Sequence, residues 1–437
     1  MEARDPFRKT QLLDACQVAP AMFEQVVPRL DTFMEPLVTI FQGQGDDQHA
    51  NTSVGGLLSD VERQHIASMA SRCGQSRLPL QRFLGSHAWD DEPVRQEWRS
   101  PVTPHWGPGD GGLVCDPSGF AKSGCASVGV ARQWGGRRGQ VDTCQVALEV
   151  GDVSRTGHPL VATRLSLPNA WTTDQARLDH AGGPQGERSS RTRHPLAVEM
   201  LANNGAGLPP RWRAGDDERG GPAWLRRRLA TWGARSLLAV PSHTTRRALE
   251  VAAPAASGRG RRPQRPWHSV EGWSQSLAEE TGRRLAGRDS ATGPLGGEAV
   301  QRRVVSRTHR RQPGDEESLG VIRDRDRENP QVVQGDSSRS NAVPETPLGA
   351  WARVAKAAQR LDACLQRSTS EAGVAEYAGR HGTGWHQHQT LSFLATGLLV
   401  RETERGKTMA PCDDLPADAP GHRDDLARGV AVRHDGA

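Results

Sequence analysis

Three acidic positions in this sequence are placed as phosphoryl-transfer chemistry requires. Asp116 ends the short apolar run GLVCD, and Asp216 follows a second strand-like run further along the chain. A third carboxylate is available on a helical stretch that begins at residue 347. Carboxylates at strand and helix ends that face one cleft can hold two divalent cations around a scissile phosphate. Because the chain has 51 Asp and Glu residues, this placement alone does not identify an enzyme.

The elements that must position these carboxylates alternate along the chain. The pattern predicts three strands, two helical stretches, a strand that reaches Asp216, a helix and a strand. The three strands cover 112–116, 141–150 and 160–167, and the two helical stretches cover 172–181 and 195–203. After the strand that reaches Asp216, the helix covers 224–232 and the last strand 236–240. We therefore expect an α/β core with the first two aspartates at strand ends.

The first hundred residues have a helical pattern. Apolar residues recur at three- and four-residue intervals over 23–33. The segment SDVE carries an S-x-x-E capping box before an apolar run that Gly74 ends, and a second short helix over 78–84 completes a helix-turn-helix outline. Such a pair either reads DNA or is a plain packing unit. We expect a helical, DNA-binding N-terminal domain over 1–104.

Composition divides the rest of the chain. The breaker-rich run PVTPHWGPGDGG marks a boundary near residue 105. Gly, Pro, Arg and Ser then dominate a stretch with weak strand signals, which we interpret as an irregular, β-rich insertion into the core. Two helices follow the insertion, and the polar end of the chain predicts disorder. We expect residues 105–250 to form the first part of the core and residues 251–345 to form the insertion. Residues 346–406 would form the C-terminal helices of the core, and residues 407–437 a disordered tail.

The bulk composition permits a nucleic-acid partner without requiring one. The 56 Lys and Arg residues against 51 Asp and Glu residues give a net charge of +5. Arginine dominates the cations and suits bidentate phosphate contacts, although a GC-rich genome also supplies arginine. Seven scattered cysteines without a C-x-x-C pair disfavour a zinc site or a disulfide framework. No leader-like or membrane-spanning apolar run occurs, so we expect a cytoplasmic protein without membrane contact.

An ordered series of segments resembles a known protein family over residues 15–410. The segments include GLLSDVERQHIASMA, SVGVARQWGGRRGQVDTCQVAL, LSLPNAWTTDQAR, RWRAGDDERG and GWHQHQTLSFLATGLLVRETERGK, in this order. Together they resemble the DDE superfamily endonucleases of bacterial insertion sequences, which are DNA-cutting and DNA-joining transposases. The resemblance implies an RNase H-like catalytic core, with the insertion lying before the third acidic position.

The resemblance assigns catalytic roles residue by residue. Asp116 in VCDPSGF matches the first aspartate of the family, and Asp216 in GDDE matches the second, with Asp217 as the alternative. Relatives have a glutamate in a segment similar to RIEECFQRAKGE, and RLDACLQRSTSE places Asp362 at that position, with Glu371 as the alternative. The implied cofactor is Mg²⁺ or Mn²⁺, held by the three aspartates.

Two departures from the family pattern change the third position. Asp362 is one methylene shorter than glutamate, which can draw the carboxylate back by about an ångström, and in-line attack tolerates such displacement badly. Thr369 stands where the resemblance implies a lysine that contacts phosphate. Both changes suggest a degenerate copy.

Basic residues supply candidate DNA contacts. The candidates are Lys122, Arg226, Arg227, Arg259, Arg261 and Arg262. Such residues either bind phosphates without reading sequence or are only solvated surface charges. His386 and His388, in WHQHQ, point apart on a helix, so we interpret them as structural rather than as metal ligands.

The leading hypothesis is a metal-dependent transposase. Mg²⁺ ions held by Asp116, Asp216 and Asp362 would activate water to nick the end of the element, and the freed 3′ hydroxyl would attack target DNA. The expected partners are terminal inverted repeats and target DNA, with at least a transient homodimer when two ends are held. The alternative is a catalytically decayed remnant that still binds DNA. A third hypothesis, an RNase H-like nuclease with a cellular role, has no feature of the sequence in its favour.

Overall fold

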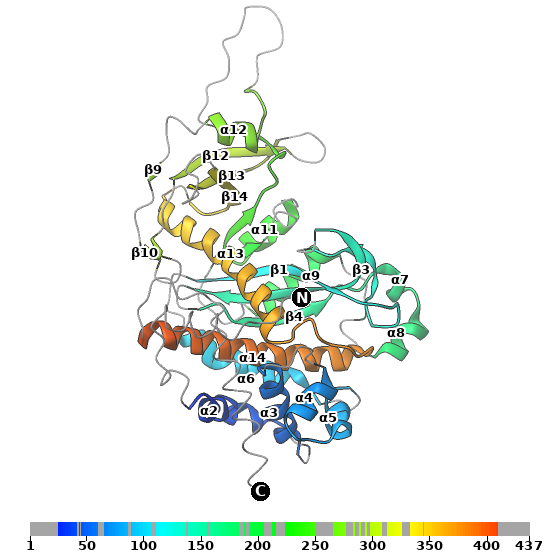
Figure 1. Cartoon of the computed structure of the whole chain (residues 1–437). Helices are drawn as coiled ribbons and strands as arrows, with labels where there is room; N and C mark the ends of the chain where they lie inside the picture. The colour runs from blue at the N-terminus through cyan, green and yellow to red at the C-terminus, as the bar shows by residue number, and fades with distance from the viewer. Residues whose placement is uncertain are drawn as a thin grey trace, which may run out of the picture.

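A computed structural model gives the fold of the chain (Figure 1). It describes residues 25–409 except for gaps at 42, 44, 60–64, 86–88, 106–110, 137–138, 155–156, 183–187, 189–191, 205–211, 216–222, 250–264, 277–282, 285–287, 290–292, 295–297, 308–312, 326–332 and 344. The described residues form a mixed α/β structure with one large mixed sheet. In Figure 1 the long helix α14 (Gly382–Met409) runs between this sheet and a layer of N-terminal helices.

The N-terminal helices pack on α14 through apolar stripes. They are α2 (Val26–Val38), α3 (Asp46–Leu57), α4 (Ile66–Arg72), α5 (Arg77–Phe83) and α6 (Asp91–His105). In α2 the buried side chains recur at helical spacing, at Val26, Leu30, Phe33, Met34 and Leu37. They share one hydrophobic core with Leu391 and Leu398 of α14. Arg29 adds an ion pair, with 2.7 Å between its Nη2 and Oε2 of Glu402.

Helix α4 begins at Ile66, whereas the capping-box pattern predicts a start directly after Ser59. The imidazole Nδ1 of His65 accepts the backbone N–H of Ser68 at 3.1 Å and so caps the helix. The Ser59 hydroxyl instead donates to the carbonyl oxygen of Gly56 at 2.6 Å, because Ser59 closes the end of α3. The prediction of Ser59 as the N-cap was therefore wrong. The glycine predicted to end α4, Gly74, does lie in left-handed backbone with φ of 64°.

The first part of the sheet is built around β1. Its strands are β1 (Gly112–Ala121), β2 (Ala131–Trp134), β3 (Val141–Val153), β4 (Leu160–Leu165), β5 (Trp212–Gly215) and β6 (Arg235–Ala239). β1 pairs antiparallel with β3 and parallel with β5, and β5 pairs parallel with β6. β2 and β4 both pair with β3. The connecting helices are α7 (Asn169–Thr172), α8 (Gln175–Ala181), α9 (Arg193–Asn203) and α11 (Ala223–Thr231). The predicted order of elements is confirmed, with β2 as an additional strand.

The second part of the sheet continues directly from β6. Its elements are β7 (Thr245–Ala248), β8 (His268–Ser269), α12 (Val270–Ser276), β9 (Arg283–Arg284), β12 (Glu298–Arg307), β13 (Pro313–Arg325) and β14 (Val333–Ser340). β14 pairs antiparallel with β6, and the order continues through β13, β12, β7 and β8. β10 (Arg288–Asp289) and β11 (Gly293–Pro294) form a separate ribbon. The β-rich stretch is thus hydrogen-bonded to the core sheet.

Different helices cover the two faces of the sheet. Alternation along β1 places Val114 in the core beneath α13 (Leu348–Glu371), whereas Leu113 and Cys115 share the other core with residues of α9 and α11. At the start of α13, the indole N–H of Trp351 donates to Oγ of Ser338 at 2.9 Å. This contact holds α13 across the boundary between the two parts of the sheet.

The predicted domain limits remain predictions. The predicted disordered tail begins at residue 407, and residues 410–437 lie outside the described residues. Within the described ranges, the helices include none that is long and apolar enough to cross a membrane.

Candidate active site

Asp116 lies near the middle of β1, the strand around which the first part of the sheet is built. It shares a sheet face with Val114, because side chains alternate along a strand, and this is the face that α13 covers. Its side chain is half-buried, between the buried Cys115 and Pro117. β1 thus extends beyond the predicted strand 112–116, and Asp116 is an interior strand residue.

Glu149 on β3 is the direct partner of Asp116 in the antiparallel register. Directly opposed residues project from the same face, with Cβ atoms about 5 Å apart. Glu149 is fully buried, and the hydroxyl of Ser118 donates to its Oε2 at 2.7 Å. Sequence reasoning missed Glu149. The signal was a carboxylate within an otherwise apolar strand, in VALEV.

The end of β5 carries the second predicted aspartate. Gly215, the last residue of β5, is paired in parallel register with Cys115. Asp216 directly follows Gly215 in the sequence, as Asp116 follows Cys115. Asp216 and the alternative Asp217 both lie outside the described residues.

Asp362 lies on α13, where this helix crosses β1 and β3. Leu361 packs against Gly151 of β3, since a Cβ on Gly151 would come within 2.5 Å of Cδ1 of Leu361. The guanidinium of Arg360 donates to the carbonyl oxygen of Ser154 at 2.8 Å, beyond the end of β3 that pairs with the start of β1. Residues two positions apart on a helix, such as Arg360 and Asp362, are separated by about 200° around the helix axis. Asp362 is exposed and lies on the side of α13 away from Arg360.

The alternative third carboxylate, Glu371, is engaged elsewhere. It lies at the last position of α13 and pairs with Arg367, with 3.0 Å between Oε2 and Nε. Thr369, which stands at the predicted lysine position, donates its hydroxyl to the carbonyl oxygen of Leu365 at 2.8 Å. Glu371 is thus held in an ion pair at the end of α13, whereas Asp362 follows Leu361, the residue that packs on β3.

The donor atoms are of the type that suits a hard divalent cation. Asp116 and Glu149 lie opposite each other on the face beneath α13, and Asp362 lies on α13 itself. Carboxylate oxygens are the ligands that Mg²⁺ and Mn²⁺ prefer. Within the described residues, no group of three or more His, Cys, Asp or Glu residues is arranged to hold a metal ion. Those residues do not include Asp216 and Asp217.

Lys122, a predicted DNA contact, is half-buried just beyond β1. Its ammonium group donates to the carbonyl oxygen of Tyr377. Burial lowers the pKa of Lys122 to about 8, against a smaller opposing effect of the nearby Glu376 carboxylate. Lys122 therefore faces the segment between α13 and α14.

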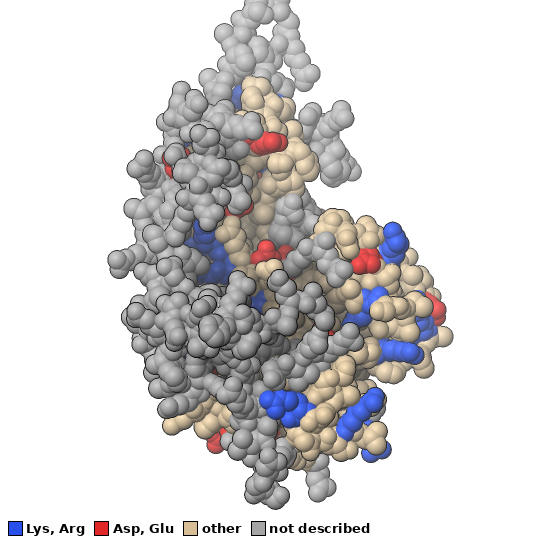
Figure 2. Space-filling model, in the orientation of Figure 1, with Lys and Arg blue, Asp and Glu red and all other residues tan. Residues whose placement is uncertain are grey.

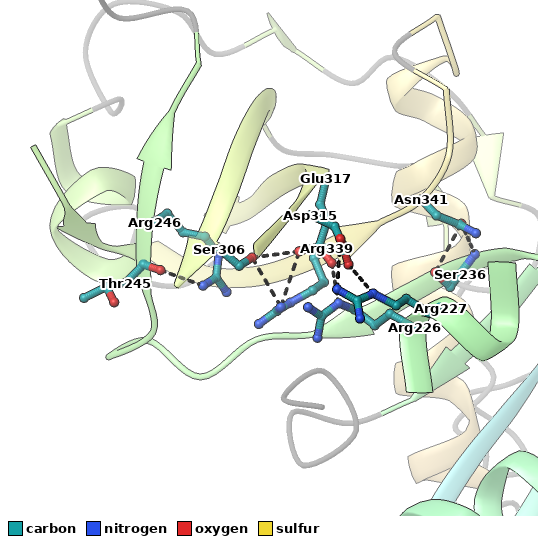
Figure 3. Close-up of polar contacts among 10 residues, drawn as sticks. All are labelled: Arg226, Arg227, Ser236, Thr245, Arg246, Ser306, Asp315, Glu317, Arg339 and Asn341. Carbon is teal, nitrogen blue, oxygen red and sulfur yellow. Dashed lines mark hydrogen bonds and ion pairs between the residues drawn. The ribbon is translucent and has the colours of Figure 1, made fainter. Parts of the chain in front are cut away.

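Arg226 and Arg227, both predicted DNA contacts, lie side by side on α11 in different environments (Figure 3). Arg226 is buried and forms an ion pair with Glu317 of β13, which gives it a role inside the protein. Arg227 is exposed and pairs with Asp315 at 2.7 Å, and this hydrogen bond holds the pKa of Asp315 below its ordinary value. The other candidates, Arg259, Arg261 and Arg262, lie outside the described residues.

Glu317 is surrounded by three buried arginines, Arg226, Arg246 and Arg339 (Figure 3). Its Oε2 accepts the Ser306 hydroxyl at 2.7 Å and lies 3.4 Å from Nη1 of Arg339. Burial and then the neighbouring Arg339 lower the pKa of Arg246. This buried charge network joins α11 to the second part of the sheet.

The two histidines of WHQHQ are buried in α14. The imidazole Nε2 of His388 lies 2.8 Å from the carbonyl oxygen of Gly373, and burial lowers the pKa of His388 to about 4. His386 packs edge-on against Trp385. These contacts favour the structural interpretation of both histidines.

Comparison with known families decides the relationship. The family whose model matches, over residues 37–294, is described as DDE superfamily endonuclease. The chain belongs to the DDE superfamily endonucleases. Such a domain supports a transposase-like nuclease function with DNA as its substrate, and nucleases of this superfamily generally use divalent metals. Among curated proteins, none matches the sequence.

The range that matches the DDE endonuclease family includes some of the candidate residues and not others. Asp116, Glu149 and Asp216 lie inside residues 37–294, whereas Asp362 lies beyond them. The match assigns no role to individual residues, so all three aspartates remain predictions from the sequence.

Proposed function

We propose that this protein is a DDE-type transposase that cleaves DNA at the ends of an insertion sequence and joins them to target DNA. The observation that carries the proposal is the pairing of β1 with β5. It brings Asp116 next to the strand end that Asp216 follows, within the range that matches the endonuclease family. The catalytic set would be Asp116, Asp216 and Asp362.

The strand arrangement supports an RNase H-like core for this enzyme. Antiparallel β4, β3 and β1 are followed by parallel β5 and β6, with helical segments between β4 and β5 and between β5 and β6. The sequence pattern predicts this order, and the resemblance implies an RNase H-like fold. The α2–α6 layer would be the N-terminal domain that binds DNA.

The residues of the chain would act by holding and orienting charge. Two divalent cations at the three aspartates would supply water activation and neutralisation of the phosphate charge. Asp116 itself pairs with Glu149 of β3, and its neighbour Cys115 pairs with Gly215 of β5, so strands on both sides hold the backbone up to Asp116. Glu149, held by Ser118, adds negative charge on the same face and so favours cation binding.

DNA is the proposed partner, as terminal repeats and target, with a homodimer when two ends are held together. Lys and Arg side chains gather at the right of Figure 2, over the region where Figure 1 places α4, α5, α7 and α8. Positive charge on this face would attract phosphates irrespective of sequence. Acting on bacterial DNA, the protein would work in the cytoplasm.

A second candidate function is a catalytically decayed remnant that binds DNA without cutting it. The shorter carboxylate at Asp362 and the threonine at Thr369 favour this alternative. Because Asp362 is exposed, an aspartate in place of the glutamate of relatives does not change the packing of the core.

The test is DNA cleavage by the purified full chain. The substrate is a duplex that carries the DNA directly outside the coding sequence, with Mg²⁺ or Mn²⁺, and a supercoiled plasmid serves as joining target. We expect metal-dependent nicking and joining by the wild type, and at least about 100-fold less with Asp116→Asn or Asp216→Asn. Glu345→Gln, at an exposed position between β14 and α13, is the matched control. Binding without nicking would support the remnant, and neither binding nor nicking would refute both functions.

A further inference from the structure

The β2–β3 hairpin ends in an exposed apolar pair. Trp134 on β2 and Val141 on β3 are direct register partners, and their side chains are 45% and 51% exposed. Large apolar side chains in a cross-strand pair stabilise a protein when they are covered. An exposed pair of this kind at the end of a hairpin indicates a contact surface.

This hairpin end lies against β1 beside the candidate catalytic aspartate. Gly136 forms an isolated antiparallel bridge with Ser118, two residues after Asp116. Gly119 packs so closely on Gly135 that a Cβ on Gly119 would come within 2.3 Å of the Gly135 carbonyl oxygen. The bridge to Ser118 therefore holds the hairpin end at the edge of β1, two residues along from Asp116, and the contact at Gly119, which lies on the opposite face of β1 from Asp116, leaves no room for a side chain there.

Cations accompany the apolar pair. Arg132 is exposed and, two residues before Trp134, shares its face of β2. The guanidinium of Arg193, at the first position of α9, donates to the backbone oxygen of Trp134 at 3.3 Å. An aromatic ring flanked by arginines matches the combination of stacking and phosphate contact by which proteins hold single nucleic-acid strands.

We propose that the hairpin end is a DNA contact next to the scissile phosphate. In this contact Trp134 stacks on a base and Arg132 contacts the phosphates of the DNA. The inference rests on the proposed endonuclease function and adds the residues that position the strand. An exposed ring between a catalytic strand and two arginines fits a base better than it fits a protein surface, because that surface would also have to neutralise the arginines.

The position of contact can be mapped directly. The photoreactive residue p-benzoylphenylalanine replaces Trp134 in one variant and Trp224, which is 46% exposed on α11, in a control variant. Each is irradiated on the labelled duplex from outside the coding sequence, and the modified nucleotide is located. We expect an adduct from position 134 within about five nucleotides of the nicked phosphate, at a rise of about 3.4 Å per base, and none there from position 224.

Binding and turnover give a second readout. We expect Trp134→Ala to weaken binding of the duplex about 10-fold, Trp134→Phe to restore most of the loss, and Trp224→Ala to have little effect. Each variant should keep the melting temperature of the wild type.

The outcomes separate the two proposals. A wild type that binds and nicks the duplex, while position 134 forms no adduct or Trp134→Ala binds normally, overturns this inference alone. Protein–protein adducts from position 134 in place of DNA adducts would also overturn it, because the hairpin would then contact a second copy. A wild type that neither binds nor nicks the duplex overturns both proposals.

Discussion

Glu149 lies directly opposite Asp116 on the neighbouring strand and is held by the hydroxyl of Ser118. A fully buried carboxylate is costly unless a hydrogen bond, an ion pair or a metal ion compensates it. Because it lies beside the candidate catalytic aspartate, we expect its charge to contribute to the proposed cation site.

Removing the charge of Glu149 should weaken cation binding. We expect Glu149→Gln to lower the affinity for Mn²⁺ by about 10-fold to 100-fold, as loss of a supporting partner of a metal ligand does. Titration calorimetry with Mn²⁺ measures this directly, independently of DNA cleavage. Ser118→Ala, which keeps the charge, should have a smaller effect. Equal Mn²⁺ affinity in wild type and Glu149→Gln would show that Glu149 is only a packing residue.

Restoring the longer carboxylate on α13 should raise activity. We expect Asp362→Glu to nick DNA at least about 10-fold faster than the wild type, because the added methylene restores the length of the glutamate that relatives have at this position. Asp362 is exposed, so the melting temperature should stay the same. The comparison is the initial nicking rate at saturating Mg²⁺, with Asp362→Asn as the inactive reference. A slower Asp362→Glu variant would mean that α13 places this residue for an aspartate.

The carboxylate of Glu317 should stabilise the junction between α11 and the second part of the sheet. Glu317→Gln leaves buried Arg226, Arg246 and Arg339 without the negative charge between them, and we expect the protein to lose about 3–5 kcal/mol of unfolding free energy. Urea unfolding measures the loss. Asp315→Asn, which breaks the exposed pair with Arg227, is the matched control and should change little. Similar losses in both variants would argue against the buried network.

The buried ammonium of Lys122 should make stability depend on pH. The pKa of Lys122 in the folded protein is about 8, below the ordinary value of 10.5. Between about pH 8 and pH 10.5 the unfolded chain therefore keeps a proton on Lys122 that the folded protein has lost. Stability should therefore rise as pH increases from about 8 toward 10.5, and the full penalty should apply below pH 8. Melting temperatures between pH 7 and 9.5 test this. Lys122→Met, which has no charge, and Lys122→Arg, which keeps it, should both lack the wild-type rise. A parallel rise in all three proteins would assign it to another group.

Local sequence patterns predicted the elements of the core. They could not predict which residues far apart in the sequence become neighbours, because this depends on strand register and long-range pairing. Alternation and apolar runs predicted the strands around Asp116 and the stretches that became α8, α9 and α11. Glu149 was missed because only the β1–β3 register places it opposite Asp116. The sequence predicted Arg226 as a DNA contact, because its buried partner Glu317 is 91 residues away along the chain. Asp216 stays a sequence prediction, supported by the register of Cys115 with Gly215.

Because β14 pairs with β6, the strands after residue 240 complete the edge of the core sheet. A chain shortened by their removal would leave the backbone of Leu237, Leu238 and Ala239 open along one side, and open apolar strands recruit other chains. Shortened descendants of this gene would therefore need another strand in place of β14. Without one, they would aggregate and could not act on DNA.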